Sequence, residues 1–254
     1  MNERDLDGRV VVVTGGSRGI GRAIVLGAIR RGAKVAFCCR ALGEDSRAVI
    51  AEAERIGGSG CVLAKSANVV REDDIESLFE AAIDRFGRVD IAVHSAGISR
   101  DQFLIQSSTE IFDDVLATNL TGAFLLARTA VREFLAAGEG GRIVFIGSIA
   151  DRGATAQAGY AASKGGLRGL ARTLAKEYGH KSIITNIVVA GWAKTELSSG
   201  LHEAAERLLL EAPLRRPGTV DEIANAALYL VSPEAGFING ETLYASGGLT
   251  ELNL

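Results

Sequence analysis

The sequence predicts an α/β fold, a parallel sheet of about seven strands with helices on both faces. Short apolar runs rich in β-branched residues alternate with longer segments of helical periodicity along the chain. The early runs are apolar almost throughout, as strands covered on both faces must be. The 254 residues contain only three prolines and no Pro/Ser-rich linker, low-complexity tract or internal repeat. We therefore expect a single domain over residues 1–254.

The strands and helices are expected in a regular order. The first strand is predicted at 10–14, where four consecutive valines precede a threonine, and the second at 34–39 (KVAFCC). Later strands are predicted at 61–67, 89–95, 142–148, 183–189 and 241–245. The helical segments are 19–31, 44–56, 71–86, 109–137, 159–179 and 219–232. This alternation favours right-handed crossovers and a Rossmann-type three-layer sandwich, in which ligands bind outside the carboxyl ends of the strands.

Composition and charge narrow the class of protein. The net charge of −3 gives no basic field for nucleic acid or an anionic membrane. The polar N-terminal segment lacks the apolar core of a signal peptide, and no run approaches the ~18 apolar residues of a membrane span. Cys38 and Cys39 are adjacent and Cys61 stands alone, a spacing that suits neither disulfides nor a metal site. We expect buried thiols, no metal and a cytoplasmic location.

A glycine-rich turn follows the first strand directly. In TGGSRGIG, residues 14–21, Gly15 permits a tight turn, Gly19 lets the main chain approach a diphosphate, and Gly21 lets the next helix pack on the strand. The N–H groups and the positive dipole at the start of that helix would face the phosphates. The position of the turn indicates a dinucleotide site rather than a flexible connection.

A second motif places two titratable groups on one helical face. In GYAASKGG, residues 159–166, Tyr160 and Lys164 are four residues apart and therefore lie one turn apart. Taken alone, this pair indicates no more than a tyrosine packed on the core beside a lysine stem. Its meaning depends on the other motifs.

Together these motifs resemble those of the short-chain dehydrogenase/reductase family. The sequence T-G-x-x-x-G-I-G matches the family's cofactor signature, and HSAG (94–97), Asn119, Ser148 and YAASK (160–164) follow in the family's order. The resemblance covers almost the whole chain and is strongest to the 3-oxoacyl-[acyl-carrier-protein] reductases. It implies an NAD(P)-dependent oxidoreductase acting on CH–OH groups.

The resemblance implies roles for four catalytic residues. Tyr160 would be the general acid in ketone reduction, and Lys164 would lower the tyrosine pKa and hold the nicotinamide ribose. Ser148 would hydrogen-bond the substrate carbonyl and stabilise the developing alkoxide. Asn119 would hold a water molecule behind Lys164 for proton relay.

The resemblance also implies a cofactor site, for which NADP(H) is favoured over NAD(H). NAD-specific relatives end the second strand with an aspartate, but here Cys39 occupies that place and Arg40 follows. Arg18 lies within the glycine turn, so two guanidiniums could bind a 2′-phosphate. The implied cofactor-binding residues are Gly15, Ser17, Arg18, Gly19, Ile20, Gly21, Arg40, Asn68, Val69, His94, Ala96, Gly97, Tyr160, Lys164, Gly191, Ala193 and Thr195.

Three positions depart from the family pattern. Asn68 replaces the usual aspartate before Val69 at the adenine ring, and its amide can still donate and accept hydrogen bonds there. HSAG replaces Asn-Asn-Ala-Gly, and we expect His94 to be structural rather than catalytic. Ala190 replaces a proline after the sixth strand, which gives the preceding segment more freedom without removing a catalytic group.

The substrate is weakly encoded. Residues 192–217 are a charged amphipathic insertion that the family uses as a substrate lid, where Trp192 either lines the pocket or pins the lid to the core. Arg168, Arg172 and Lys176 recur every four residues on the catalytic helix. Such a stripe suits an acidic acyl carrier protein, and it is equally consistent with a solvated face.

Three functions remain open at this point. The first is NADPH-dependent reduction of a ketone, best matched by a 3-oxoacyl thioester on acyl carrier protein, of fatty-acid or polyketide type. The second is oxidation or reduction of a free small alcohol, sugar or ketone. The third is a non-catalytic NADP-binding regulator, against which the complete set of Ser148, Tyr160 and Lys164 argues.

The family also implies a homotetramer. A second docking patch at Arg128 and Arg132 is doubtful because Glu133 lies beside them.

Overall fold

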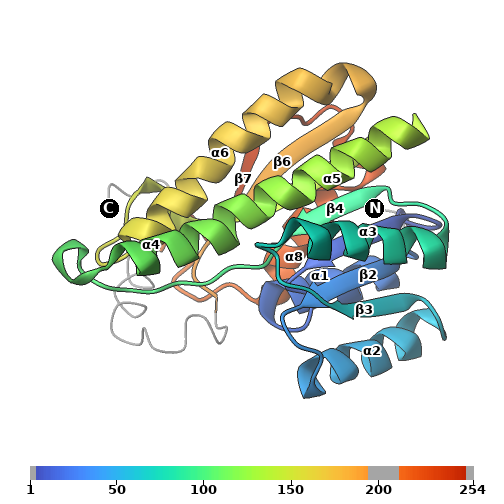
Figure 1. The fold of residues 1–254 in the computed structure, drawn as a ribbon, viewed down its shortest axis with the longest axis horizontal. Helices are drawn as coiled ribbons and strands as arrows, with labels where there is room; N and C mark the ends of the chain where they lie inside the picture. Colours follow the sequence, from blue (N-terminus) through green and yellow to red (C-terminus); the bar gives the residue numbers. More distant parts are fainter. Residues whose placement is uncertain (1–3, 194–211, 250–254) are drawn as a thin grey trace.

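The computed structural model describes residues 4–193 and 212–249. Within these ranges, seven strands form one parallel sheet in the order β3-β2-β1-β4-β5-β6-β7 (Figure 1). The strands are β1 (Val10–Thr14), β2 (Lys34–Cys39), β3 (Val62–Ser66), β4 (Ile91–His94), β5 (Gly141–Ser148), β6 (Ile183–Ala190) and β7 (Thr242–Ala245). The chain runs outward from β1 to β3 and then returns to place β4 on the other side of β1. The space between β1 and β4 is therefore the topological switch point, where this type of sheet binds ligands.

Helices cover both faces of the sheet, which confirms the predicted three-layer sandwich. They are α1 (Gly19–Arg30), α2 (Glu44–Gly57), α3 (Glu72–Phe86), α4 (Thr109–Leu116), α5 (Gly122–Ala137), α6 (Ala158–Tyr178) and α8 (Val220–Leu230). One buried cluster joins the sheet to α1, α2 and α8, and a second joins the opposite face to α3, α5 and α6. Figure 1 shows α5 and α6 running side by side across the second face.

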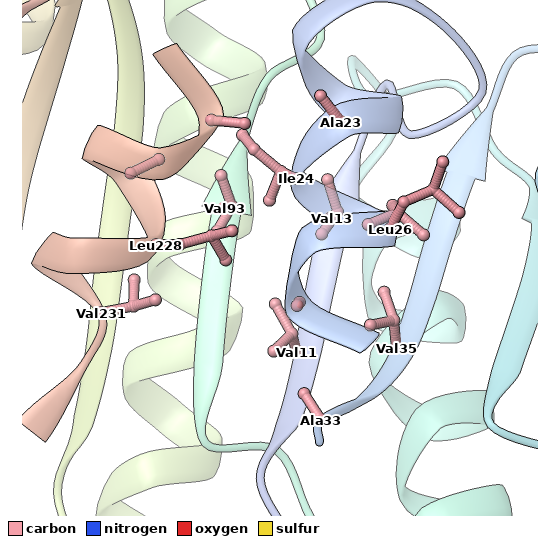
Figure 2. Packing of buried hydrophobic residues seen from close by; sticks show 14 of the residues in the cluster. Val11, Val13, Ala23, Ile24, Leu26, Ala33, Val35, Val93, Leu228 and Val231 are labelled. Carbon is pink, nitrogen blue, oxygen red and sulfur yellow. The ribbon is translucent and has the colours of Figure 1, made fainter. Parts of the chain in front are cut away.

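The valine run of β1 shows why its sequence is apolar without alternation. Val11 and Val13 point into the cluster beneath α1 and α8, whereas Val12 points into the opposite cluster. Figure 2 shows Val13 beside Ile24 of α1, with Val11 further along the strand and also beneath α1. Both faces of this strand are buried, so each valine is needed by one layer or the other.

One predicted helix is interrupted in the structure. The segment 109–137 is helical throughout, but residues Ala117–Thr121 form a π-helical turn between α4 and α5. Such a turn accommodates one extra residue and occurs frequently at functional sites. Thr118 and Asn119, within the turn, are both buried. Hydrophobic periodicity could not distinguish this turn from a continuous α-helix.

Buried ion pairs close the amino-terminal edge of the sheet. The Asp90 carboxylate is 5% exposed and accepts hydrogen bonds from the Val10 N–H at 2.9 Å and from Arg9 at 2.8 Å. The Asp5 carboxylate, 3% exposed, accepts a 2.7 Å hydrogen bond from Nε of Arg31. These partners compensate the loss of hydration at carboxylates that lie far from the switch-point edge.

The cysteines are free thiols, and the prediction that they are buried is confirmed for Cys38 and Cys61 but is wrong for Cys39. Cys38 and Cys61 lie in the two cores, and Cys39 is partly exposed at the end of β2. Burial raises the pKa of Cys38 to about 12, so it remains protonated. Within the described ranges, no helix is both long and apolar enough to span a membrane.

Leu228→Ala is expected to lower the free energy of unfolding by about 2–5 kcal/mol, because it leaves a cavity between α8 and α1. The Leu228 side chain is 1% exposed, and a methyl group placed on Gly27 would come within 2.5 Å of it. Leu104→Ala is the control, since Leu104 is 74% exposed and its loss should change stability by less than ~0.5 kcal/mol. Urea unfolding at one protein concentration measures both, and equal changes would contradict this packing.

Candidate active site

The glycine turn brings two strand ends into main-chain contact. Gly15 has a φ of +69°, and a Cβ placed on it would lie 2.8 Å from Cα of Ala96. A Cβ on Gly21 would lie 2.1 Å from the carbonyl oxygen of Gly15. No other residue type fits either position without displacing the main chain. The turn therefore lies against the loop that follows β4, at the switch point.

The N-terminus of α1 is prepared for an anion. Its N-cap residue, Arg18, makes no side-chain hydrogen bond to the helix, and its first turn contains no acidic residue. In contrast, α2 begins with Glu44 and Asp45, and three acidic residues occupy the first turn of α3. The free N–H groups and helix dipole of α1 suit a diphosphate, and the glycine cradle leaves room for one. A dinucleotide therefore fits this site.

The expected adenosine end of the site lies at the ends of β2 and β3. Arg40 and Arg18 are exposed, and the Cys39 thiol donates a 3.2 Å hydrogen bond to the carbonyl of Ala41. The main-chain N–H of Asn68 donates to Asp74 at 2.8 Å. The side-chain Oδ1 of Asn68 accepts a 3.5 Å hydrogen bond from the N–H of Val70, and its Nδ2 can contact a ligand.

Two of the predicted cofactor residues are more buried than their role suggests. Val69 is 8% exposed and packs against Gly122 of α5, where an added Cβ would lie 3.1 Å away. His94 is fully buried, and its Nδ1 lies 3.0 Å from Oγ1 of Thr14. Burial, and then the charge of Lys164, lower the pKa of His94 to about 3, so the ring is neutral. Its side chain has no surface to offer a ligand.

The structure brings together Ser148, Tyr160, Lys164 and Asn119 from three elements. Ser148 ends β5, Tyr160 and Lys164 lie on α6, and Asn119 lies in the π-helical turn. The Ser148 hydroxyl lies close enough to the Tyr160 phenol to lower the pKa of Tyr160. The ammonium of Lys164 lies 5.6 Å from the centre of the Tyr160 ring and donates a 2.8 Å hydrogen bond to the carbonyl of Ile146. This is an acid–base group held in a buried, polar setting.

Asn119 fixes the loop after β4 against α6. Its Oδ1 accepts a 2.8 Å hydrogen bond from the N–H of Ile98, and its Nδ2 donates to the Ile98 carbonyl and to the Ser163 hydroxyl, both at 3.0 Å. A Cβ on Gly97 would lie 3.3 Å from Oδ1 of Asn119 and 3.5 Å from Nζ of Lys164. Glycine at 97 therefore lets both groups approach the same stretch of main chain.

The electrostatics of the acid–base pair are dominated by burial. Burial raises the pKa of the Tyr160 phenol, the Ser148 hydrogen bond lowers it, and the nearby charge of Asp101 raises it. Burial also lowers the pKa of Lys164 to about 8. In this structure the pKa of Tyr160 is raised overall, because desolvation of the phenol outweighs the contribution of Ser148. The lowering expected from Lys164 and the oxidised nicotinamide stays a prediction.

Three polar residues of this site were missed by the motifs. Asp101 acts on Tyr160 and accepts a 2.8 Å hydrogen bond from Nε2 of Gln157. Ser163 is fully buried and donates to the carbonyl of Tyr160 at 2.7 Å. Ser163 lies within the quoted YAASK motif and could have been found there, whereas the Asp101–Gln157 contact joins distant segments.

The segment after β6 is described only at its start. A Cβ on Gly191 would lie 2.5 Å from Cα of Ser246, so the main chains after β6 and β7 are in contact. Ala193 is buried and pairs with Gly218 in an isolated bridge. Trp192 is partly buried, and its indole Nε1 has no hydrogen-bond partner among the described residues. Thr195 and most of the predicted lid fall in 194–211, outside the described residues.

The site thus has two parts at the carboxyl edge of a parallel sheet. One is an anion cradle at a helix N-terminus, and the other is a group formed by the partly buried Ser148 and Tyr160 and the buried Lys164. Together they define a dinucleotide-dependent oxidoreductase of the α/β class.

Comparisons with known proteins identify the family. The family model described as enoyl-(acyl carrier protein) reductase matches residues 15–250. The 3-oxoacyl-[acyl-carrier-protein] reductase FabG of Escherichia coli (strain K12) is 38% identical over 247 residues, which cover 96% of this chain and 98% of the relative. The human 3-oxoacyl-[acyl-carrier-protein] reductase is 39% identical over 242 residues, 95% and 98% of the two chains. A short-chain dehydrogenase/reductase from Serratia marcescens BCRC 10948 has a similar structure, with a TM-score of 0.90, 35% identity and coverage of 97% and 99%. The chain belongs to the short-chain dehydrogenase/reductase family.

Gly21→Ala is expected to weaken nicotinamide cofactor binding by at least about tenfold, because the added methyl group collides with the Gly15 carbonyl and opens the cradle. Gly169→Ala is the matched control, since an added Cβ on this exposed helical glycine meets nothing within 4 Å. Fluorescence titration with NADPH measures both variants. Wild-type affinity in Gly21→Ala would contradict the proposed fit.

Proposed function

We propose that this protein reduces 3-oxoacyl thioesters carried on acyl carrier protein, with NADPH as the hydride donor. The observation that carries the proposal is the contact of Ser148, Tyr160 and Lys164 beside the glycine cradle. Relatives of 35–39% identity over nearly the full chain are named 3-oxoacyl-[acyl-carrier-protein] reductases, which supports this substrate class. We treat residues 1–254 as one domain, because both described cores share one sheet.

A reduced nicotinamide, when bound, supplies the hydride. The main-chain N–H groups of the glycine turn and the N-terminus of α1 would hold the diphosphate, and Lys164 would hold the nicotinamide ribose. Gly97 and Gly191 would lie at the nicotinamide end, with the Gly191 N–H donating to the Ala245 carbonyl at 2.9 Å. These assignments rest on the cradle geometry and on the family pattern.

The protein's own residues would manage the proton. Tyr160 gives its phenolic proton to the carbonyl oxygen as the alkoxide develops, and the Ser148 hydroxyl donates a hydrogen bond to the same oxygen. The ketone gains one hydride and one proton and becomes a secondary alcohol, and Tyr160 is left as phenolate. The ammonium of Lys164 stabilises that phenolate. With a pKa of about 8, Lys164 can also exchange a proton near neutral pH.

Asn119 would contribute to the proton relay mainly by holding the surrounding main chain in place, because most of its hydrogen-bonding groups are already used. Both N–H groups of its amide and one acceptor site of Oδ1 are already used by Ile98 and Ser163. One lone pair of Oδ1 remains, on the side of Gly97 that also faces Lys164. A water molecule held there would connect Lys164 to the relay.

The cofactor preference is proposed to be NADP(H) rather than NAD(H). Cys39 stands where a ribose-binding aspartate would exclude a 2′-phosphate, and Arg40 and Arg18 lie at the exposed end of the site.

The carrier-protein surface is smaller than the sequence suggests. Arg168 is drawn into an ion pair with the buried Asp151 and is not available for docking. Arg132 pairs with Glu76 at 2.5 Å, and Arg128 pairs with a glutamate of α3. The exposed Arg172 and Lys176 on α6 remain as the proposed docking cations.

A homotetramer is also proposed. Large apolar side chains are exposed on α5, at Phe124 and Leu135, and around β7, at Phe237 and Leu243. Such side chains on two separate elements are suited to two interfaces between copies. We further propose a cytoplasmic location, which the free cysteines favour.

Tyr160→Phe is expected to lower ketone reduction by roughly 10²–10⁴-fold while NADPH still binds, because only the proton donor is removed. Tyr178→Phe, on the same helix, is the control and should leave turnover unchanged. NADPH oxidation is followed with acetoacetyl-acyl carrier protein, acetoacetyl-coenzyme A, and a panel of free ketones and sugars. Thioester preference, greatest on the carrier, supports the proposal. Preference for free carbonyls would favour a small-molecule reductase, and no turnover with any substrate would favour a regulator.

Arg40→Asp is expected to invert the cofactor preference, because a carboxylate repels the 2′-phosphate and can bind the ribose hydroxyls. The wild-type protein should have a higher kcat/KM with NADPH than with NADH. Arg55→Asp, at the far end of α2, makes the same charge change as a control. A wild-type preference for NADH would refute the NADP(H) assignment.

A further inference from the structure

The distance between Ser148 and Tyr160 is not set by the chain that joins them. Ser148 ends β5 and is followed by a short 3₁₀ helix, η3 (Ile149–Arg152), while Tyr160 lies on α6. The connection between these helices lacks regular structure and contains two left-handed residues, Gly153 (φ +107°) and Ala156 (φ +62°). The packing of α6 on β5 and β6 brings the two residues together, and the contact between η3 and α6 adds a second constraint on the serine hydroxyl next to the phenol.

A buried ion pair provides this contact. Asp151, on η3, has a side chain that is 1% exposed, and its Oδ2 accepts hydrogen bonds from Nε of Arg168 at 2.9 Å and from Nη2 at 2.5 Å. Arg168 lies one turn beyond Lys164 and two turns beyond Tyr160 on α6, so the three side chains share one helical face. The main-chain carbonyl of Asp151 is also close to α6, 3.3 Å from a Cβ placed on Gly165.

Tyr244 of the edge strand β7 supports the same arginine. Nη2 of Arg168 donates to the Tyr244 hydroxyl, and its guanidinium lies 5.5 Å from the ring centre. Arg152 donates to the same hydroxyl at 3.2 Å and lies 5.3 Å from the ring centre. The cluster therefore links η3, α6 and β7, three elements that meet beside the acid–base group.

Within the described ranges, only Oδ2 of Asp151 is hydrogen-bonded, so the buried carboxylate depends on Arg168 for compensation of its charge. Oδ1 is buried and has no hydrogen-bond partner among the described residues. Without Arg168, the buried carboxylate is uncompensated, and η3 can relieve this only by moving toward water. Without the carboxylate, the ion pair no longer ties η3 to α6, so η3 can move away from the helix. Such a movement would carry Ser148 away from Tyr160.

We propose that Asp151 and Arg168 are positioning residues that hold the Ser148 hydroxyl next to the Tyr160 phenol. The inference rests on the proposed acid–base role of Tyr160. Three polar or charged groups face the phenol: Ser148 from β5, Asp101 from the loop after β4, and Lys164 from α6. Of these, the Ser148 hydrogen bond lowers the pKa of Tyr160, whereas burial and Asp101 raise it. Loss of the pair should therefore move that pKa further upward.

The test uses the reverse reaction, because alcohol oxidation requires the phenolate. Its rate rises with pH as Tyr160 loses its proton, so a higher pKa moves the midpoint of kcat to higher pH. Asp151→Asn is expected to raise the midpoint by about one pH unit, with an approximately tenfold lower kcat near neutral pH. The KM for NADP+ should remain within about twofold, since the cradle is untouched. The assay uses a 3-hydroxyacyl thioester as the substrate and the protein of residues 1–254 as the enzyme.

Asp5→Asn is the matched control. It neutralises a carboxylate of similar burial that also pairs with an arginine, Arg31, but at the opposite edge of the sheet. It should lower stability without moving the pH midpoint. An unchanged midpoint in Asp151→Asn, or an equal shift in Asp5→Asn, would overturn the inference.

A second series covers the case in which Asp151→Asn does not fold. Arg168→Lys keeps a cation for Asp151 and should give a midpoint between those of the wild type and Arg168→Gln. Wild-type midpoints in both variants would also overturn the inference. The proposed function is judged separately by Tyr160→Phe. If that variant is inactive while the Asp151 and Arg168 variants keep the wild-type midpoint, only the positioning inference fails.

Discussion

The main-chain contact between Gly15 and Ala96 is the constraint on which the rest of the site depends. Thr14 and His94 are register partners in β1 and β4, so the two strands end side by side at the switch point. Only a residue without Cβ lets the turn after β1 cross the loop after β4 at this distance. The contact directs α1 toward the same edge as the loop that Asn119 holds, and so places the anion cradle beside the acid–base group.

Two titratable side chains, Lys164 and His94, are buried beneath that edge. They can be buried together because His94 is neutral. Lys164 is 5% exposed and has the Ile146 carbonyl as its hydrogen-bond partner. Burial, and then the charge of the nearby Lys164, lower the pKa of His94, so its ring is neutral. A second positive charge there would further lower the pKa of Lys164, so an uncharged His94 helps to keep the ammonium protonated near neutral pH.

Much of this architecture could be read from the sequence, because its signals are local. The valine run of β1 predicted a strand buried on both faces, and TGGSRGIG predicted a turn that only glycine permits. Seven strands and their order along the chain followed from such runs. The misses arise where distant residues meet. The four-residue spacing predicts a surface cation at Arg168. The buried partner, Asp151, lies on another element, and no local sequence pattern indicates their contact. The direction of the Tyr160 pKa likewise depends on burial, which four-residue spacing cannot report.

The π-helical turn at Ala117–Thr121 has a consequence for how this chain can change in length. The helix on one side, α4, packs on α6, whereas α5 packs on α3, β4 and β5. Each residue of an α-helix turns the face by about 100°. Deleting one residue from the turn would restore ordinary helical hydrogen bonding, yet it would rotate the apolar side of α5 away from the sheet. A change in the length of this turn would therefore disrupt the packing of α5, although helix propensity alone would tolerate such a change.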